Sequence, residues 1–229
     1  MGPRSRDLLA SLSGSDRTIE ELAYYRSAIL QLGDINVRAN RLSYVGELGY
    51  ELLVAENDMG SLFDLLTESD EGFEVGLAGY HAMNSCRMEK GYRHWGHDIH
   101  DHINPYEAGL SFVVSLDKGN FIGREALLKA KHRNERRLCG VSIECEGAPF
   151  MIHDEPIYRN GERVGLTTSA AWGHRVNQSL AIADVSHADG IDNEWIETGD
   201  FEVEVATTRY PVSLQMRPFY DPNQARIKA

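Results

Sequence analysis

Four histidines and two aspartates lie within nine residues, between His94 and His102. Neutral imidazole is the most common transition-metal ligand in proteins, so this cluster raises the hypothesis of a metal site. The spacing matches no standard zinc motif, and no cysteine pair lies nearby. We interpret the segment first as a polar loop. The alternative is a metal-binding protein that uses His94, His97, His100 and His102.

A second candidate is Glu47, which lies in the turn Gly46-Glu47-Leu48-Gly49. Glycines let the backbone bend tightly and approach a ligand closely. A carboxylate held there can accept two parallel hydrogen bonds from an amidine-like edge, such as that of a pterin ring. The competing interpretation is an ordinary exposed glutamate in a turn.

The third candidate is Arg87, which shares a mostly apolar helical segment with Glu89. An unpaired buried charge is costly, so the arginine is expected to have a carboxylate partner. A guanidinium group in this position could also face Glu47 or the carboxylate of a substrate.

Two weaker candidates complete the set. Trp172 could close over a flat ligand, although a core aromatic is the default interpretation. An anionic tail could be bound by several arginines that otherwise serve as solvated surface charges: Arg124, Arg133, Arg136 and Arg137.

The composition is that of a globular protein. The 229 residues include 23 basic and 35 acidic side chains, a net charge of −12, which argues against nonspecific nucleic-acid binding. No apolar run is long enough to span a membrane. Three cysteines without a C-x-x-C pair indicate free thiols, and with no signal-peptide pattern at the start we expect a cytoplasmic protein, or a mitochondrial matrix protein in a eukaryote. Dinucleotide-binding, Walker A and G-x-S-x-G motifs are absent from the sequence.

The elements that must position these residues fall into two classes. Apolar periodicity predicts helices over 3–13, 58–68, 79–90 and 123–134, with Gly91 ending the third. Strands are expected over 27–33, 35–44, 50–55 and 110–116, with a loop over 97–109. From residue 136 the pattern becomes short alternating runs with an Asn160-Gly161 hairpin, typical of a β-barrel. We therefore expect an α+β domain over 1–134 and a β-barrel of about six strands over 135–229.

Ordered motifs along the whole chain resemble the glycine-cleavage T-protein (aminomethyltransferase) family. They include GPRSRDLL, RLSYVGELGYEL, SCRMEKGYRHWGHDI, NPYEAGL, TTSAAWGHRVNQSLAIADV and FYDPNQARIK. EKGYRHWGHD and DPNQARIK are most similar to the folate-binding C-terminal portion of sarcosine and dimethylglycine dehydrogenases. The resemblance implies a module that captures a one-carbon unit as 5,10-methylenetetrahydrofolate.

By this resemblance, tetrahydrofolate is bound by Tyr44, Glu47, Arg87 and Trp95. The resemblance also implies that the folate-binding domain is incomplete at its N-terminus, and that the family's catalytic aspartate lies upstream of this chain. FAD chemistry would belong to a further domain or a partner subunit, so the chain alone is expected to be an incomplete enzyme. The alternative is a non-catalytic regulatory or interaction subunit, which would use an unpaired sheet edge to bind a partner or to self-associate.

Overall fold

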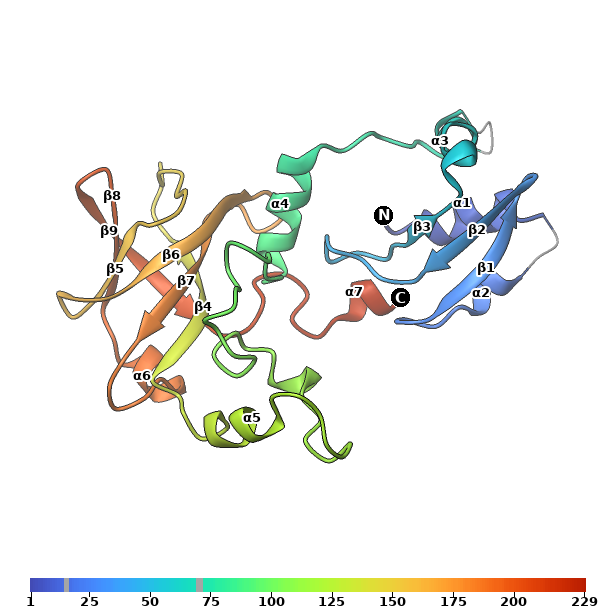
Figure 1. Cartoon of the computed structure of the whole chain (residues 1–229). Coiled ribbons are helices and arrows are strands. Elements are labelled where there is room, and N and C mark those ends of the chain that lie inside the picture. The colour runs from blue at the N-terminus through green and yellow to red at the C-terminus, as the bar shows by residue number, and fades with distance from the viewer. Residues whose placement is uncertain (15–16, 69–71) are drawn as a thin grey trace. The chain divides into compact units, whose positions relative to one another are not determined.

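The computed structural model describes residues 1–14, 17–68 and 72–229 (Figure 1). These residues form two compact units. Unit 1 comprises Met1–Cys86 and Asn223–Ala229, and unit 2 comprises Arg87–Pro222. The helix α4 (Tyr80–Glu89) supplies residues to both units. In the part of the chain that the structure describes, no helix has the length and apolar character needed to cross a membrane.

The sheet of unit 1 has three antiparallel strands in the order β1-β2-β3. Strands β1 (Ser27–Leu32) and β2 (Ile35–Asn40) form a hairpin, and β3 (Glu51–Leu53) pairs with the other edge of β2. Gly33, in the hairpin turn, has a φ of +55°, a conformation that favours glycine. The sequence-predicted strands are confirmed, although β2 ends at Asn40 and not at residue 44.

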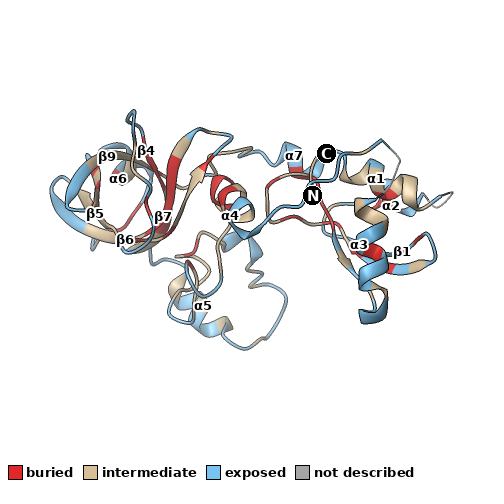
Figure 2. Cartoon of the chain, turned by 90° about the horizontal axis from the view of Figure 1, so that it is seen from above, coloured by how far each residue is buried: buried red, intermediate tan, exposed pale blue. Residues whose placement is uncertain are grey.

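One face of this sheet carries the core of unit 1. Alternate residues of β1 and β2 are buried, as the twofold period of a strand requires (Figure 2). They pack in one apolar cluster with side chains from three helices. The helices of unit 1 and one short 3-10 turn are α1 (Ser5–Leu12), α2 (Thr18–Glu21), η1 (Glu56–Asp58), α3 (Met59–Thr67) and α7 (Ala225–Lys228).

Unit 2 contains a closed six-stranded barrel, which confirms the barrel of about six strands predicted from the sequence. The strand order is β4-β7-β6-β5-β8-β9. Closure pairs every strand on both sides and leaves no sheet edge. The barrel encloses an apolar core that includes Val141, Ile157 and Val203. Its strands are β4 (Arg136–Ile143), β5 (Pro156–Arg159), β6 (Glu162–Gly173), β7 (Gln178–Ser186), β8 (Phe201–Val205) and β9 (Thr208–Gln215).

The turn between β5 and β6 follows the sequence prediction. Asn160 and Gly161 have φ values of +51° and +83°, as a two-residue hairpin with two left-handed positions requires. Two short helices lie outside the barrel strands of unit 2: α5 (Arg124–Ala130) and α6 (Asn193–Glu197). Helix α5 begins where predicted but ends four residues earlier than expected.

The strand predicted over 110–116 is wrong. The segment instead contains a 3-10 turn, η2 (Ser111–Val113), in which Phe112 and Val113 are exposed. An apolar run looks the same in sequence whether it pairs with a strand or turns at the surface. The predicted domain boundary between residues 134 and 135 stays a prediction.

Candidate functional site

The loop after β2 holds two of the predicted site residues, Tyr44 and Glu47, both partly buried. The amide of Val45 donates a hydrogen bond of 3.2 Å to Ser43 Oγ, and Gly46 turns the backbone with a φ of +75°. The next residue, Leu48, is buried in the core of unit 1. The Leu48 carbonyl also accepts a hydrogen bond of 2.8 Å from the Gly2 amide, so the backbone is anchored on both sides of Glu47.

Arg87 lies near the end of α4 and is assigned to unit 2. The helix ends in a Schellman motif, in which the Gly91 amide bonds Met88 O at 2.9 Å and the Tyr92 amide bonds Arg87 O at 2.9 Å. Gly91 has a φ of +64°, which confirms it as the helix stop. The motif folds the chain back, so that the Tyr92 carbonyl accepts a hydrogen bond of 3.1 Å from Arg87 Nη1.

The partner of Arg87 is Asp98. Arg87 Nη1 lies 2.7 Å from Asp98 Oδ2, with the two side chains 3% and 0% exposed. The sequence prediction of a carboxylate partner for this arginine is confirmed. Its identity was missed, because Asp98 lies inside the histidine-rich segment and was interpreted there as part of a polar loop.

Asp98 accepts three further hydrogen bonds. The His94 amide donates to Oδ2 at 2.8 Å, and the hydroxyls of Thr168 and Ser169 donate to Oδ1 at 2.6 and 2.5 Å. Four donors therefore satisfy the two oxygens of this buried carboxylate. Helix α4, the loop after it and strand β6 therefore each donate hydrogen bonds to the same carboxylate.

A second buried carboxylate, Glu89, has its own partner. Arg175 Nε lies 2.5 Å from Glu89 Oε2, and the Arg175 amide donates to Oε1. The neighbouring Arg93 donates to three backbone carbonyls, those of Gly91, Ala108 and Leu138. Burial lowers the pKa of Arg93, and the nearby Asp98 charge acts in the opposite direction. The charges around α4 are thus compensated within unit 2.

The fourth predicted site residue, Trp95, is 71% exposed on the turn that Asp98 closes. The histidine-rich segment around it forms two ring pairs, His94 with His97 and His100 with His102, with centroids 4.7 and 5.7 Å apart. Across residues 1–14, 17–68 and 72–229, no three His, Cys, Asp or Glu side chains group in a way that could hold a metal ion. The metal alternative therefore has no ligand set there.

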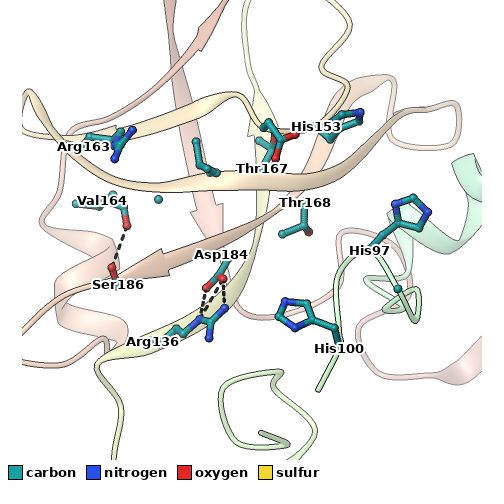
Figure 3. A pocket seen from close by; sticks show the side chains of 14 residues that line it. His97, His100, Arg136, His153, Arg163, Val164, Thr167, Thr168, Asp184 and Ser186 are labelled. Carbon is teal, nitrogen blue, oxygen red and sulfur yellow. Dashed lines mark hydrogen bonds and ion pairs between the residues drawn. The ribbon is translucent and has the colours of Figure 1, made fainter. Parts of the chain in front are cut away.

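An open cavity of about 760 Å³ lies against β6 in unit 2 (Figure 3). Arg136, one of the arginines considered for an anionic tail, lines it but is bound to Asp184 at 2.5 to 3.0 Å. This hydrogen bonding raises the pKa of Arg136 above its usual value. The cavity is lined by His97, His100, His153, Arg163 and Thr168, among others.

The other sequence candidates are dispersed. Arg124 donates to the carbonyl of Leu116 and Arg137 to that of Tyr106, while Arg133 is exposed. Trp172 is partly buried on β6, with its ring 5.8 Å from that of Phe150. The structure thus groups Tyr44 with Glu47 in unit 1, and connects Arg87 to the turn that carries Trp95 in unit 2.

Known proteins match both parts of this chain. Residues 1–118 match the GCVT N-terminal domain, and residues 136–221 match the glycine cleavage T-protein C-terminal barrel domain. The solved glycine cleavage system aminomethyltransferase T of Bartonella henselae is similar over 95% of this chain and 57% of its own, with a TM-score of 0.77 and 22% identity. The similarity of fold therefore extends through both units.

Three curated relatives each contain a region that is similar to most or all of this chain. The 4-methylaminobutanoate oxidase (formaldehyde-forming) of Paenarthrobacter nicotinovorans is 39% identical over all of this chain and 27% of its own length. The mitochondrial sarcosine dehydrogenase of Mus musculus is 32% identical over 99% of this chain and 25% of its own. The aminomethyltransferase of Thermotoga sp. (strain RQ2) is 35% identical over 84% of this chain and 52% of its own. The chain spans a quarter to a half of these relatives, and it belongs to the glycine cleavage T-protein family.

Proposed function

We propose that this chain is a tetrahydrofolate-binding module that takes up the one-carbon unit of an N-methyl amine as 5,10-methylenetetrahydrofolate. The observation that carries the proposal is the match of residues 1–118 and 136–221 to the two domains of the T-protein family. The dehydrogenase and oxidase relatives are named for substrates of one chemical class, a methylated amine that also bears a carboxylate.

The chemistry of the donor set fits a folate. Glu47 presents a carboxylate from an anchored turn, suited to the amino and ring N–H groups of a pterin. Arg87 supplies a buried cation whose charge is compensated by Asp98. Trp95 presents an exposed indole suited to stacking on an aromatic group.

Each predicted residue has a distinct role in this proposal. When bound, tetrahydrofolate supplies the N5 and N10 nitrogens that hold the one-carbon unit. Glu47 orients the pterin through paired hydrogen bonds, and Tyr44 packs beside it. Arg87 donates hydrogen bonds from its guanidinium group to the ligand, and Trp95 limits access of water to it.

The wider enzyme is part of the same proposal. Oxidation of the N-methyl amine requires an electron acceptor, and an FAD-dependent dehydrogenase domain or subunit would provide it. The chain would then act as the folate-dependent part of a sarcosine- or dimethylglycine-type dehydrogenase, in the cytoplasm or the mitochondrial matrix.

Anaerobic calorimetric titration with tetrahydrofolate tests the proposal. We expect one-site binding that Glu47→Gln weakens about ten-fold, because a hydrogen bond between a charged group and its partner contributes about 1.5 to 3 kcal/mol. Glu51→Gln, at the exposed start of β3, is the matched control and should bind as the wild type does. Equal binding by Glu47→Gln and the wild type would show that the site assignment is wrong.

A second candidate function is a non-catalytic interaction subunit. Two observations favour it: β1 lies at an edge of the three-stranded sheet, and Phe112, Val113 and Ile122 are exposed in unit 2. Size-exclusion chromatography with light scattering tests this function. Self-association without folate binding would favour it, whereas a stable monomer that binds tetrahydrofolate would argue against it.

A further inference from the structure

The barrel of unit 2 contains an irregularity at one point in β6. Strand β6 pairs Thr167 with Ala183 and Ser169 with Ile182 of β7. The two β7 residues are adjacent in the chain, whereas the two β6 residues are separated by Thr168. Thr168 is therefore the extra residue of a β-bulge. Bulges redirect side chains, and they break the alternation that otherwise sends neighbouring residues to opposite faces.

The side chains of Thr168 and Ser169 both contact Asp98. Thr168 Oγ1 and Ser169 Oγ both donate to Oδ1 of Asp98, at 2.6 and 2.5 Å. In a regular strand these consecutive side chains would point to opposite faces, and one carboxylate oxygen could not accept from both. Thr168 Oγ1 also lies 3.2 Å from the Ile182 carbonyl, but the ionised carboxylate is the nearer and stronger acceptor.

The opposite oxygen of Asp98 holds Arg87. Oδ2 accepts from Arg87 Nη1 at 2.7 Å and from the His94 amide at 2.8 Å. Arg87 Nη1 carries two N–H groups, and its two acceptors are Asp98 Oδ2 and the Tyr92 carbonyl. Because the guanidinium group is planar and rigid, fixing Nη1 at two points also fixes the direction of Nε and Nη2.

We propose that Asp98 is the positioning residue of the folate site, and that the β6 bulge exists to hold Asp98 while Asp98 orients Arg87. The inference rests on the proposed function for its ligand. The chain of contacts runs from Thr168 and Ser169 in the barrel, through a fully buried carboxylate, to a cation that is 3% exposed. A surface ion pair would not have this effect, since exposed pairs exchange freely with water.

The decisive variant is Thr168→Val, which keeps the shape of the side chain and removes one donor to Asp98. Thr208→Val, at the exposed start of β9, is the matched control. Asp98→Asn is the stronger change, because its amide replaces an acceptor with a donor beside Arg87 and two hydroxyls. Thermal melting of each variant identifies any that fail to fold.

Two measurements separate positioning from stability. The first is the NMR spectrum of the Arg87 guanidinium group, assigned by its loss in Arg87→Lys, in which a held group gives distinct Nη signals. The second is the dissociation constant for tetrahydrofolate. We expect Thr168→Val to merge the Nη signals and to weaken binding about ten-fold while it stays folded, and Asp98→Asn to weaken binding more.

The inference is overturned if folded Thr168→Val or Asp98→Asn keeps the Arg87 signals of the wild type, or if the signals merge while binding is unchanged. Thr208→Val should match the wild type in both measurements. Failure of the wild type to bind tetrahydrofolate would contradict the proposed function. In that case the Arg87 signals alone decide whether Asp98 positions the arginine.

Discussion

The two units hold their candidate ligand-binding residues in different ways. In unit 1, Glu47 lies on a loop that is held by its own residues Ser43 and Gly46 and by the N-terminal segment. The Gly2 amide and the Ser5 hydroxyl both donate to the Leu48 carbonyl. In unit 2, Arg87 depends on Asp98, and Asp98 depends on hydroxyls 70 and 71 residues further along the chain. Arg87 is therefore held through contacts of its own side chain, whereas the loop that carries Glu47 is held through its backbone and neighbouring side chains.

The sheets of the two units differ in a related way. The barrel is closed, so each of its strands has two neighbours, whereas the three-stranded sheet of unit 1 ends at β1 and β3. Only one face of that sheet carries the apolar cluster, and Ile29 is exposed on the other. Substitutions in this sheet should therefore have effects that depend on which face the side chain occupies.

The largest expected effect comes from truncating the two candidate residues in parallel. Arg87→Ala should lower the free energy of unfolding by about 4 kcal/mol, because it leaves the Asp98 charge buried without its cation. Glu47→Ala should change it by less than about 0.5 kcal/mol, since Glu47 is only partly buried and lies on a loop outside the helices and strands. Urea denaturation of both variants measures the difference. Equal shifts in the two variants would remove the contrast between the units.

Much of the local structure could be predicted from the sequence. The Gly91 stop, the Asn160-Gly161 hairpin and the barrel strands follow from short-range patterns. The loop around Glu47 could be anticipated for the same reason, because its glycines and flanking apolar residues are adjacent in the chain. Family resemblance then identified Arg87 as a candidate, beyond what helix periodicity alone supported.

The Asp98 network could not be predicted in this way. A β-bulge is not visible in the alternation of β6, and nothing within a few residues of Asp98 indicates that Thr168 and Ser169 will donate to it. The histidines around Asp98 suggested metal chemistry instead. The strand predicted over 110–116 was wrong for a different reason. Its apolar pattern is present in the sequence, but the segment forms a 3-10 turn and does not pair with a strand.

The second prediction concerns the two faces of the sheet in unit 1. Leu32→Ala should cost about 3 kcal/mol, since Leu32 is fully buried and its truncation leaves a cavity in the core. Ile29→Ala, on the exposed face of the same strand, should cost less than about 1 kcal/mol. Chemical denaturation compares them. A large effect at Ile29 would indicate that a partner or a second copy covers that face.

The third prediction tests how tightly the barrel is packed. A Cβ atom at Gly165 would collide with the backbone carbonyl of Asp184 on the paired strand. Gly165→Ala should therefore destabilise unit 2 by about 2 kcal/mol or more. Gly60→Ala in helix α3 of unit 1 is the control, because its Cβ would meet open space and alanine favours helix. A stable Gly165→Ala barrel would show that β6 and β7 can separate locally.

The smallest effect should come from Cys139, whose thiol is buried in the barrel core. Burial raises the pKa of the Cys139 thiol from 9.0 to about 11. Below pH 9 the thiol is neutral in both the folded and the unfolded chain. Between pH 9 and 11 the unfolded chain loses its proton first, so unfolding becomes progressively more favourable. The loss amounts to about 1.4 kcal/mol at pH 10.

Denaturation midpoints of the wild type and Cys139→Ala between pH 8 and pH 11 measure this linkage. The alanine variant starts from a lower stability, because it removes a buried group, but its stability should fall less steeply with pH. Cys145→Ala, at an exposed position, controls for the loss of a thiol and should follow the wild-type slope. Parallel slopes for wild type and Cys139→Ala would mean that water reaches the barrel interior, so that closure of the barrel does not exclude solvent from its core.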